Sequence, residues 1–155
     1  MWVFVKWFYL IALSVWIGEI VFFSFVVAPS VFRAFPPSDA GRAVAAIFPT
    51  YYQIGYVCGV VLLLASVGFL ISGAARTVWG VAASLSAAML VATLYAGLAV
   101  QPRASALRLQ MHAEATLPPV KDAFDRLHRT AVWLNGGVLI GGIVLSILTA
   151  ARLRP

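Results

Sequence analysis

Charged side chains are scarce in this sequence. Asp, Glu, Lys and Arg make up 10% of its 155 residues, against 63% for the hydrophobic residues. A soluble domain carries about 25% charged residues, so this composition excludes an ordinary soluble fold. The charge that is present is mostly positive, with a net charge of +6. Because the Lys and Arg residues gather in loops and at helix ends, we expect them to contact lipid head groups and not nucleic acid.

Cysteine is almost absent. The single residue, Cys58, excludes an intramolecular disulfide and a cysteine-cluster metal site. Phosphate-binding glycine loops, serine–histidine–carboxylate sets and zinc-binding helices are missing from the sequence as well. No nucleophile has a candidate base beside it, which disfavours enzymatic chemistry without deciding the question.

Long apolar runs are what the sequence has in abundance. A bilayer core of ~30 Å takes about 20 apolar residues per helix. Four segments have that length: 8–28, 51–71, 77–100 and 130–150. They use up most of the chain, so the predicted fold is all-α, a single domain over residues 1–155 that forms a multi-pass bundle of four transmembrane helices. An even number of spans places both termini on the same side of the membrane.

The two sides of the membrane differ in basic residues. The side with the two longer loops carries seven Lys and Arg residues, and the side with the termini carries four. By the positive-inside rule, the raw count places the longer loops in the cytoplasm. The terminal segments are much shorter, and their charge per residue favours the opposite orientation. The orientation therefore stays open.

The two longer loops contain helical signals. In the first, Ser38 can cap an Ala-rich segment and Pro49 can end it, which predicts a short helix lying along the membrane interface. In the second, residues 104–116 favour a helix, and Pro118 and Pro119 mark the start of another. We expect spans three and four to extend beyond the membrane as a helical hairpin.

Small residues recur at helical spacing within the spans. Gly55 and Gly59 form such a pair in span two. Span three carries small residues at every fourth position: Gly80, Ser84, Ala88, Ala92 and Ala96. Stripes of this kind let transmembrane helices approach closely. They fit contacts within one bundle and also a homodimer, and the sequence does not separate these readings.

The membrane spans contain one ionisable acid, Glu19. An acid at the centre of a transmembrane helix costs at least ~2.5 kcal/mol, so it needs a partner or a function. Counting residues from the ends of the spans puts three other polar side chains at neighbouring depths, one on each remaining span. They are Tyr56, Tyr95 and Asn135.

These residues predict a polar vestibule that opens on the loop side. His128 and Arg103 would lie at its entrance, with Glu19 and Asn135 inside. A structural reading has Glu19 protonated and hydrogen-bonded to Asn135 or to a tyrosine hydroxyl. A functional reading makes Glu19 the titrating group of a proton or cation relay. His128 is a helix-end hydrogen-bonding residue or, less commonly, a haem or metal ligand, and no cofactor is predicted.

One set of motifs resembles a known family. Phe124, His128 and Asn135 have the spacing of the Phe-x-x-x-His…Asn signature near the last span of transmembrane-protein-205-like proteins. Similar pieces occur earlier in the same order, at 16–18, 48–51 and 102–103. The resemblance implies four spans and a membrane location, and it brings no settled reaction. The acid that follows Gly18 departs from the family pattern.

Three functions fit these features. The leading hypothesis is a non-enzymatic membrane protein that handles a small solute or ion through the vestibule, and it would require a dimer because one four-helix unit lacks the duplicated halves of many transporters. The second is an accessory subunit of a larger membrane complex. The third is a membrane protein that binds haem or a metal through His128.

Overall fold

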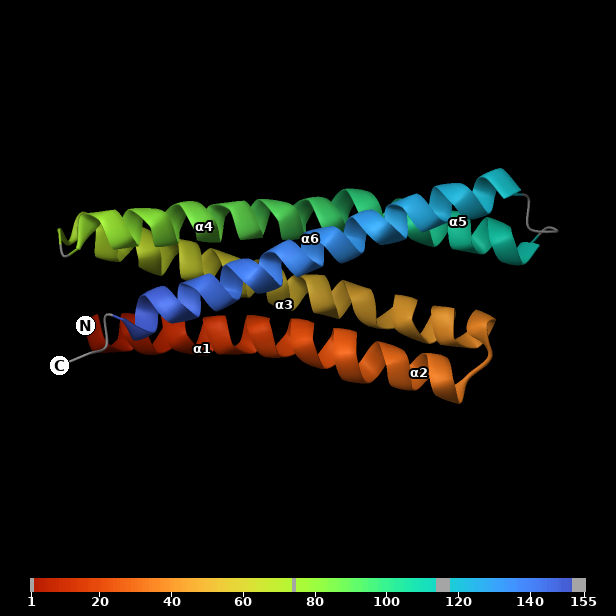
Figure 1. Cartoon of the computed structure of the whole chain (residues 1–155), viewed down its shortest axis with the longest axis horizontal. Coiled ribbons are helices and arrows are strands. Elements are labelled where there is room, and N and C mark those ends of the chain that lie inside the picture. The colour runs from red at the N-terminus through yellow and green to blue at the C-terminus, as the bar shows by residue number, and fades with distance from the viewer. Residues whose placement is uncertain (1, 74, 114–117, 152–155) are drawn as a thin grey trace.

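The computed structural model describes residues 2–73, 75–113 and 118–151, apart from the side chains of residues 112 and 113. Four long helical runs lie along a common axis (Figure 1): Trp2–Ala34, Pro37–Ile71, Arg76–Met111 and Pro118–Ala150. All four are long and apolar enough to cross a bilayer. No strand occurs among the described residues. The predicted all-α bundle of four transmembrane helices is confirmed, and the chain is an integral membrane protein.

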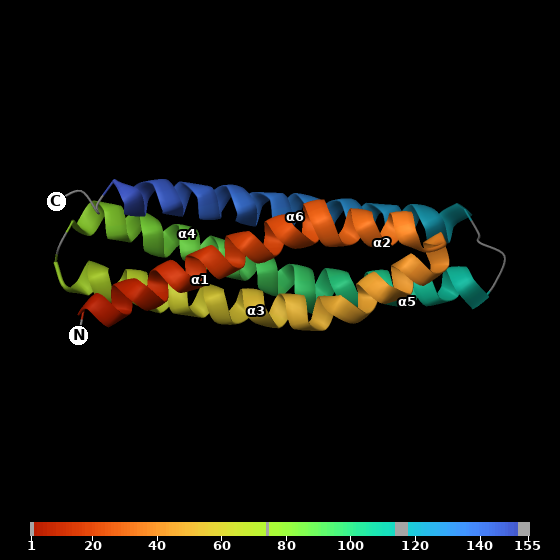
Figure 2. The same cartoon turned by 90° about the horizontal axis from the view of Figure 1, so that it is seen from below.

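Two of the runs are divided by short π-helical segments. The first consists of α1 (Trp2–Phe22), η1 (Phe23–Val27) and α2 (Ala28–Ala34), and the third of α4 (Arg76–Tyr95), η2 (Ala96–Val100) and α5 (Gln101–Ala113). The second and fourth are the single helices α3 (Pro37–Ile71) and α6 (Pro118–Ala150). The start of α1 and the end of α6 lie at the same end of the bundle (Figures 1 and 2).

Each π-helical segment lies just before a proline. The amide of Ala28 donates to the carbonyl of Phe23, one residue before Pro29. The amide of Gln101 donates to the carbonyl of Ala96, one residue before Pro102. A proline has no N–H to donate, and its ring crowds the carbonyl four residues earlier, so the wider turn keeps the helix continuous past it.

The first long loop differs from its prediction. Pro49 lies inside α3, which continues from Pro37 to Ile71 without a break. The expected interfacial helix is therefore wrong, because its residues form the first turns of the second span. The prediction treated Pro49 as a terminator, whereas transmembrane helices tolerate proline when neighbouring groups satisfy the freed backbone carbonyl.

The predicted helical hairpin is present. Helices α5 and α6 pack against each other beyond the third span. Runs of 33–36 residues are about 50 Å long at 1.5 Å per residue, well over the ~30 Å of a bilayer core. This length lets the helices reach through the head-group region, where the basic residues of α5 and of the first turns of α6 are favoured.

The four runs are arranged as a square in which neighbouring helices pack. Contacts join α1 to α3, α3 to α4, α4 to α6 and α6 to α1. Within the described residues, α3 and α6 make no direct helix contact and are diagonal to each other. A side chain that links these two helices must therefore cross the interior of the bundle.

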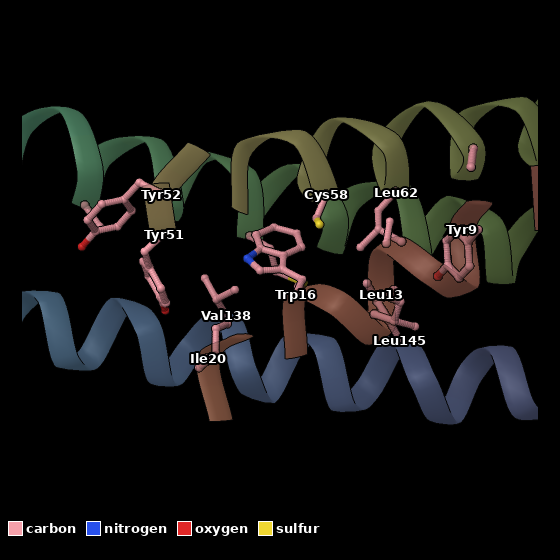
Figure 3. Close-up of a cluster of buried hydrophobic side chains, with 14 of the residues drawn as sticks. Tyr9, Leu13, Trp16, Ile20, Tyr51, Tyr52, Cys58, Leu62, Val138 and Leu145 are labelled. Atoms are coloured by element: carbon pink, nitrogen blue, oxygen red, sulfur yellow. The ribbon is translucent and has the colours of Figure 1, made fainter. Parts of the chain in front are cut away.

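Trp16 occupies the centre of this interior (Figure 3). Its indole is 2% exposed and packs on α3 at Gly55 and Gly59. A Cβ atom at Gly59 would come within 3.0 Å of the indole and 2.9 Å of Leu90, so the absence of a side chain permits this contact. The glycine pair thus serves packing within the bundle. On α4, by contrast, Ser84 and Ala88 of the predicted stripe are exposed on the outer surface.

Candidate functional site

Glu19 lies on α1 with its carboxyl group directed into the protein. Both carboxyl oxygens are buried, and neither has a hydrogen-bond partner among the described residues. The carboxyl group is close enough to interact electrostatically with the hydroxyl of Tyr51 and the thiol of Cys58, both on α3. The buried acid of the first span therefore has its nearest noted electrostatic neighbours on the second span.

Tyr51 links the second span to the fourth. Its hydroxyl donates a hydrogen bond of 2.8 Å to Oδ1 of Asn135. The ring of Tyr51 points toward α6 (Figure 3) and lies 5.1 Å from the ring of Phe23 on η1, centroid to centroid. Because α3 and α6 are diagonal, this bond crosses the bundle. We call Glu19, Tyr51 and Asn135 the inner polar site.

The predicted tyrosines do not join the inner polar site. Tyr95 is 52% exposed on the outer surface of α4, where it faces the lipid. Tyr56 stacks on Tyr52, with ring centroids 6.4 Å apart, and packs against Gly97 of η2. Of the predicted interior residues, Asn135 is hydrogen-bonded to Tyr51, which the sequence analysis did not name, and the carboxyl oxygens of Glu19 are buried without a hydrogen-bond partner among the described residues.

The Tyr56 side of α3 borders a separate outer groove of about 320 Å³. It lies where α3 meets η2, and its polar walls include Gln53, Gln101 and Tyr56. Gly97 is required here, because a Cβ atom at this position would overlap the Tyr56 hydroxyl and approach Cγ of Tyr52 to 2.7 Å. Glu19 is not among the residues that line this groove.

A larger cavity of about 560 Å³ lies at the loop-side end of the bundle, opposite the start of α1. We call it the loop-end cavity, and all four helical runs contribute to its lining: Phe32, Pro37, Ser38, Gly41, Arg108, Met111, Phe124 and His128. The predicted entrance residue His128 is among them, whereas Arg103 is exposed and is not part of the lining.

The basic residues of this cavity are held in an aromatic stack. The guanidinium of Arg108 donates a hydrogen bond to the carbonyl oxygen of Gly41 and lies 5.2 Å from the centroid of the Phe124 ring. The imidazole of His128 is nearly parallel to the same ring, with centroids 6.2 Å apart and planes 11° apart. Arg108 thereby connects α3, α5 and α6 while presenting its charge to the cavity.

The side chains described do not gather as a metal site. Across 2–73, 75–113 and 118–151, no group of three or more His, Cys, Asp or Glu residues comes together. The exposed His128 and the buried Cys58 lie on different helices with no such group around either. His128 is the candidate metal ligand that the sequence analysis named, and the described residues form no ligand group around it.

Two residues of these sites were missed in the sequence. Tyr51 precedes Gly55 by one helical turn, so the Gly55 and Gly59 pair that marks the packed face of span two also points to Tyr51. Tyr56 lies about 100° away from that face. For Arg108 no comparable signal exists, because it is one of seven basic residues on the loop side and its contact with Gly41 is a tertiary one.

Comparison with known proteins identifies a family and nothing finer. A model described as "Domain of unknown function (DUF4149)" matches residues 11–113, which reach from α1 to the end of α5 and include Glu19, Tyr51 and Arg108. No curated protein and no solved structure matches the chain. Since the matched segment covers well over half of the sequence, the chain belongs to the DUF4149 family.

Proposed function

We propose that this membrane protein handles a small solute or ion, and that Glu19 binds a proton or a small cation and passes it across the bilayer. The observation that carries the proposal is the buried, unpartnered carboxyl group of Glu19 inside a transmembrane bundle. An acid at this depth is expensive, and one that only held helices together would be hydrogen-bonded. A proton or cation arriving from outside would compensate its charge.

The neighbours of Glu19 support a titrating role. The hydroxyl of Tyr51 is near enough to interact electrostatically with the carboxyl group, and its proton is directed to Asn135. Polar groups of α1, α3 and α6 would thus contribute to the proposed path. Polar side chains that face the interior of a membrane bundle commonly mark the path of a proton or an ion.

The active unit in this proposal is a homodimer. One chain supplies four spans and lacks the pair of repeated halves between which many transporters hold their substrate. A second copy would supply the missing half. Light scattering on the protein in detergent tests this step, and a mass equal to one chain under conditions that retain activity would contradict it.

The central experiment measures flux in liposomes. The purified protein is reconstituted with a pH-sensitive dye inside, and a potassium diffusion potential drives cation or proton entry. We expect uptake with the wild type, and uptake at the level of empty liposomes with Glu19→Gln, which keeps the shape of the side chain but cannot ionise. Asp125→Asn is the matched control, because it removes an exposed acid of α6.

Two outcomes would refute the proposal. One is a wild-type protein with no proton or cation flux at any pH. The other is a Glu19→Gln variant that transports as fast as the wild type. In either case an accessory subunit of a larger membrane complex would be the candidate to pursue, through proteins that co-purify in mild detergent.

We also propose that the chain is related to transmembrane-protein-205-like proteins. The family match ends at residue 113, and the Phe124, His128 and Asn135 spacing lies beyond it. Two of these residues line the loop-end cavity, and the third accepts the hydrogen bond of Tyr51. The spacing of these three residues would therefore place one side of α6 against both the loop-end cavity and the inner polar site. This placement is a physical reason for the motif.

A further inference from the structure

The loop-end cavity combines an apolar lining with two basic side chains. Phe32, Pro37, Met111 and Phe124 supply most of its walls, and Arg108 and His128 supply nitrogen donors. Cavities of this kind suit a ligand that has an apolar body and a negatively charged or hydrogen-bond-accepting end. Glu19 does not line this cavity. The ligand of the cavity is therefore distinct from the ion proposed to bind at Glu19.

In the described part of the chain, one side of the cavity, between α2 and α6, is not closed by helix packing. Within the described residues, α2 packs on η1 and α3 and makes no contact with α5 or α6. Helices α1 and α6 pack together. The first and fourth helical runs then diverge toward the loop-side end of the bundle, where α2 lies (Figure 1). Phe32 belongs to α2 and lines the cavity at this divergence.

Exposed aromatic residues place this opening at the level of the lipid. Phe32 and Phe35 are 50% and 53% exposed, although both follow Pro29 and the end of the predicted first span. Phenylalanine side chains exposed to this extent are stable beside acyl chains and are costly in water. An acyl chain in the bilayer can therefore reach the mouth of the cavity.

The charge of this end of the protein selects the head group. Residues 29–50 and 101–129 contain seven Lys and Arg against four Asp and Glu. Inside the cavity, the guanidinium of Arg108 is held at the lining by the Gly41 carbonyl and the Phe124 ring. Basic pockets between transmembrane helices are typical sites for acidic lipid head groups.

We propose that the loop-end cavity binds the phosphate head group of an anionic membrane lipid, whose acyl chains leave between α2 and α6. Arg108 supplies the charge that attracts the phosphate. His128 supplies a nitrogen at the rim, and Phe32 and Met111 contact the first carbons of the lipid. The site is distinct from the inner polar site, and the proposal does not depend on transport.

The test compares two lipids with the same acyl chains. Purified protein in detergent is titrated with phosphatidylglycerol and with phosphatidylcholine, and lipid-bound protein is counted by native mass spectrometry. We expect phosphatidylglycerol to bind the wild type at least about 5-fold more tightly, the preference that one well-placed Arg near a membrane surface supplies. Arg108→Gln should remove most of this preference.

Arg126→Gln is the matched control. It removes the same charge from the exposed surface of α6, outside the cavity lining, and should leave the preference intact. Because Arg108 also links α3 to α5, its loss could disturb the fold, so a second variant fills the cavity and keeps every charge. Ser38→Phe adds a ring to the lining, at a position with no helix-capping bond, and should weaken phosphatidylglycerol binding.

Three results would overturn the proposal. The first is equal affinity of the wild type for the two lipids. The second is an equal loss in Arg126→Gln and Arg108→Gln, which would indicate attraction to the whole basic surface. The third is displacement of the lipid by inorganic phosphate at concentrations similar to those of the lipid, because the ligand would then be a soluble anion.

Discussion

The hydroxyl of Tyr51 reaches across the bundle to Asn135, on the helix diagonal to its own. The two side chains meet at 2.8 Å in the loop-side half of the membrane. Helices α3 and α6 have no direct packing contact within the described residues, so this bond ties together two runs that otherwise interact through α1 and α4.

The first prediction concerns the energy of this bond. Hydrogen bonds between transmembrane helices average about 0.6 kcal/mol and reach about 1.7 kcal/mol. We expect a double-mutant cycle of Tyr51→Phe and Asn135→Leu to give a coupling energy in the upper part of this range, because both groups are shielded from water. Unfolding by sodium dodecyl sulfate in mixed micelles, followed by circular dichroism, measures it.

The control for this cycle is Tyr95→Phe. It removes the same hydroxyl from a side chain that faces outward from α4. We expect this variant to unfold at the wild-type detergent concentration and to show no coupling with Asn135→Leu. A coupling energy near zero for the Tyr51 pair would mean that the bond contributes nothing to the folded state.

The sequence specifies the position of a residue along a helix more firmly than the direction in which its side chain points. Counting residues from the ends of the spans placed Glu19 and Asn135 at one level, because the rise of a helix is fixed. The direction of a tyrosine depends on the rotation of α3, and a membrane helix has apolar residues on all sides, so hydrophobic periodicity does not report it. Tyr56 and Tyr95 were named from their depth alone, and in the structure Tyr56 stacks on Tyr52 while Tyr95 is exposed on the outer surface.

Proline shows a second limit of the sequence. Pro29 and Pro102 follow π-helical turns within continuous runs, and Pro49 lies inside α3. A rule that ends helices at proline describes soluble proteins, where water competes for the freed carbonyl. In a bilayer the unpaired backbone of a loop is more costly than a distorted helix, so the helix continues. The expected interfacial helix failed for this reason.

The second prediction concerns the close approach of α3 and η2. Gly97→Ala would place a methyl group against the Tyr56 hydroxyl and the Tyr52 ring. Overpacking of this kind typically costs about 1–3 kcal/mol, and we expect a loss of stability in that range. Gly137→Ala is the control, since a Cβ there has no neighbour within 4 Å. Equal unfolding of the two variants would show that α3 and η2 can separate freely.

The third prediction concerns His128. Its imidazole is exposed at the rim of the loop-end cavity and stacks on Phe124, and the described residues place no group of metal-ligating side chains around it. We expect the purified protein to show no visible absorption band and no stoichiometric metal, and His128→Ala to change stability by less than about 0.5 kcal/mol, as exposed substitutions usually do. A band or a metal that disappears in this variant would establish His128 as a ligand.

The last prediction separates stability from function at Glu19. Removing a buried polar group that has no hydrogen-bond partner relieves a cost of about 1–3 kcal/mol, so Glu19→Leu should unfold at a higher detergent concentration than the wild type. The same variant should be inactive in liposomes. Residues kept for function at the expense of stability behave in this way. If Glu19→Leu instead destabilises the protein by a similar amount, the carboxyl group holds the bundle together, and its role is structural.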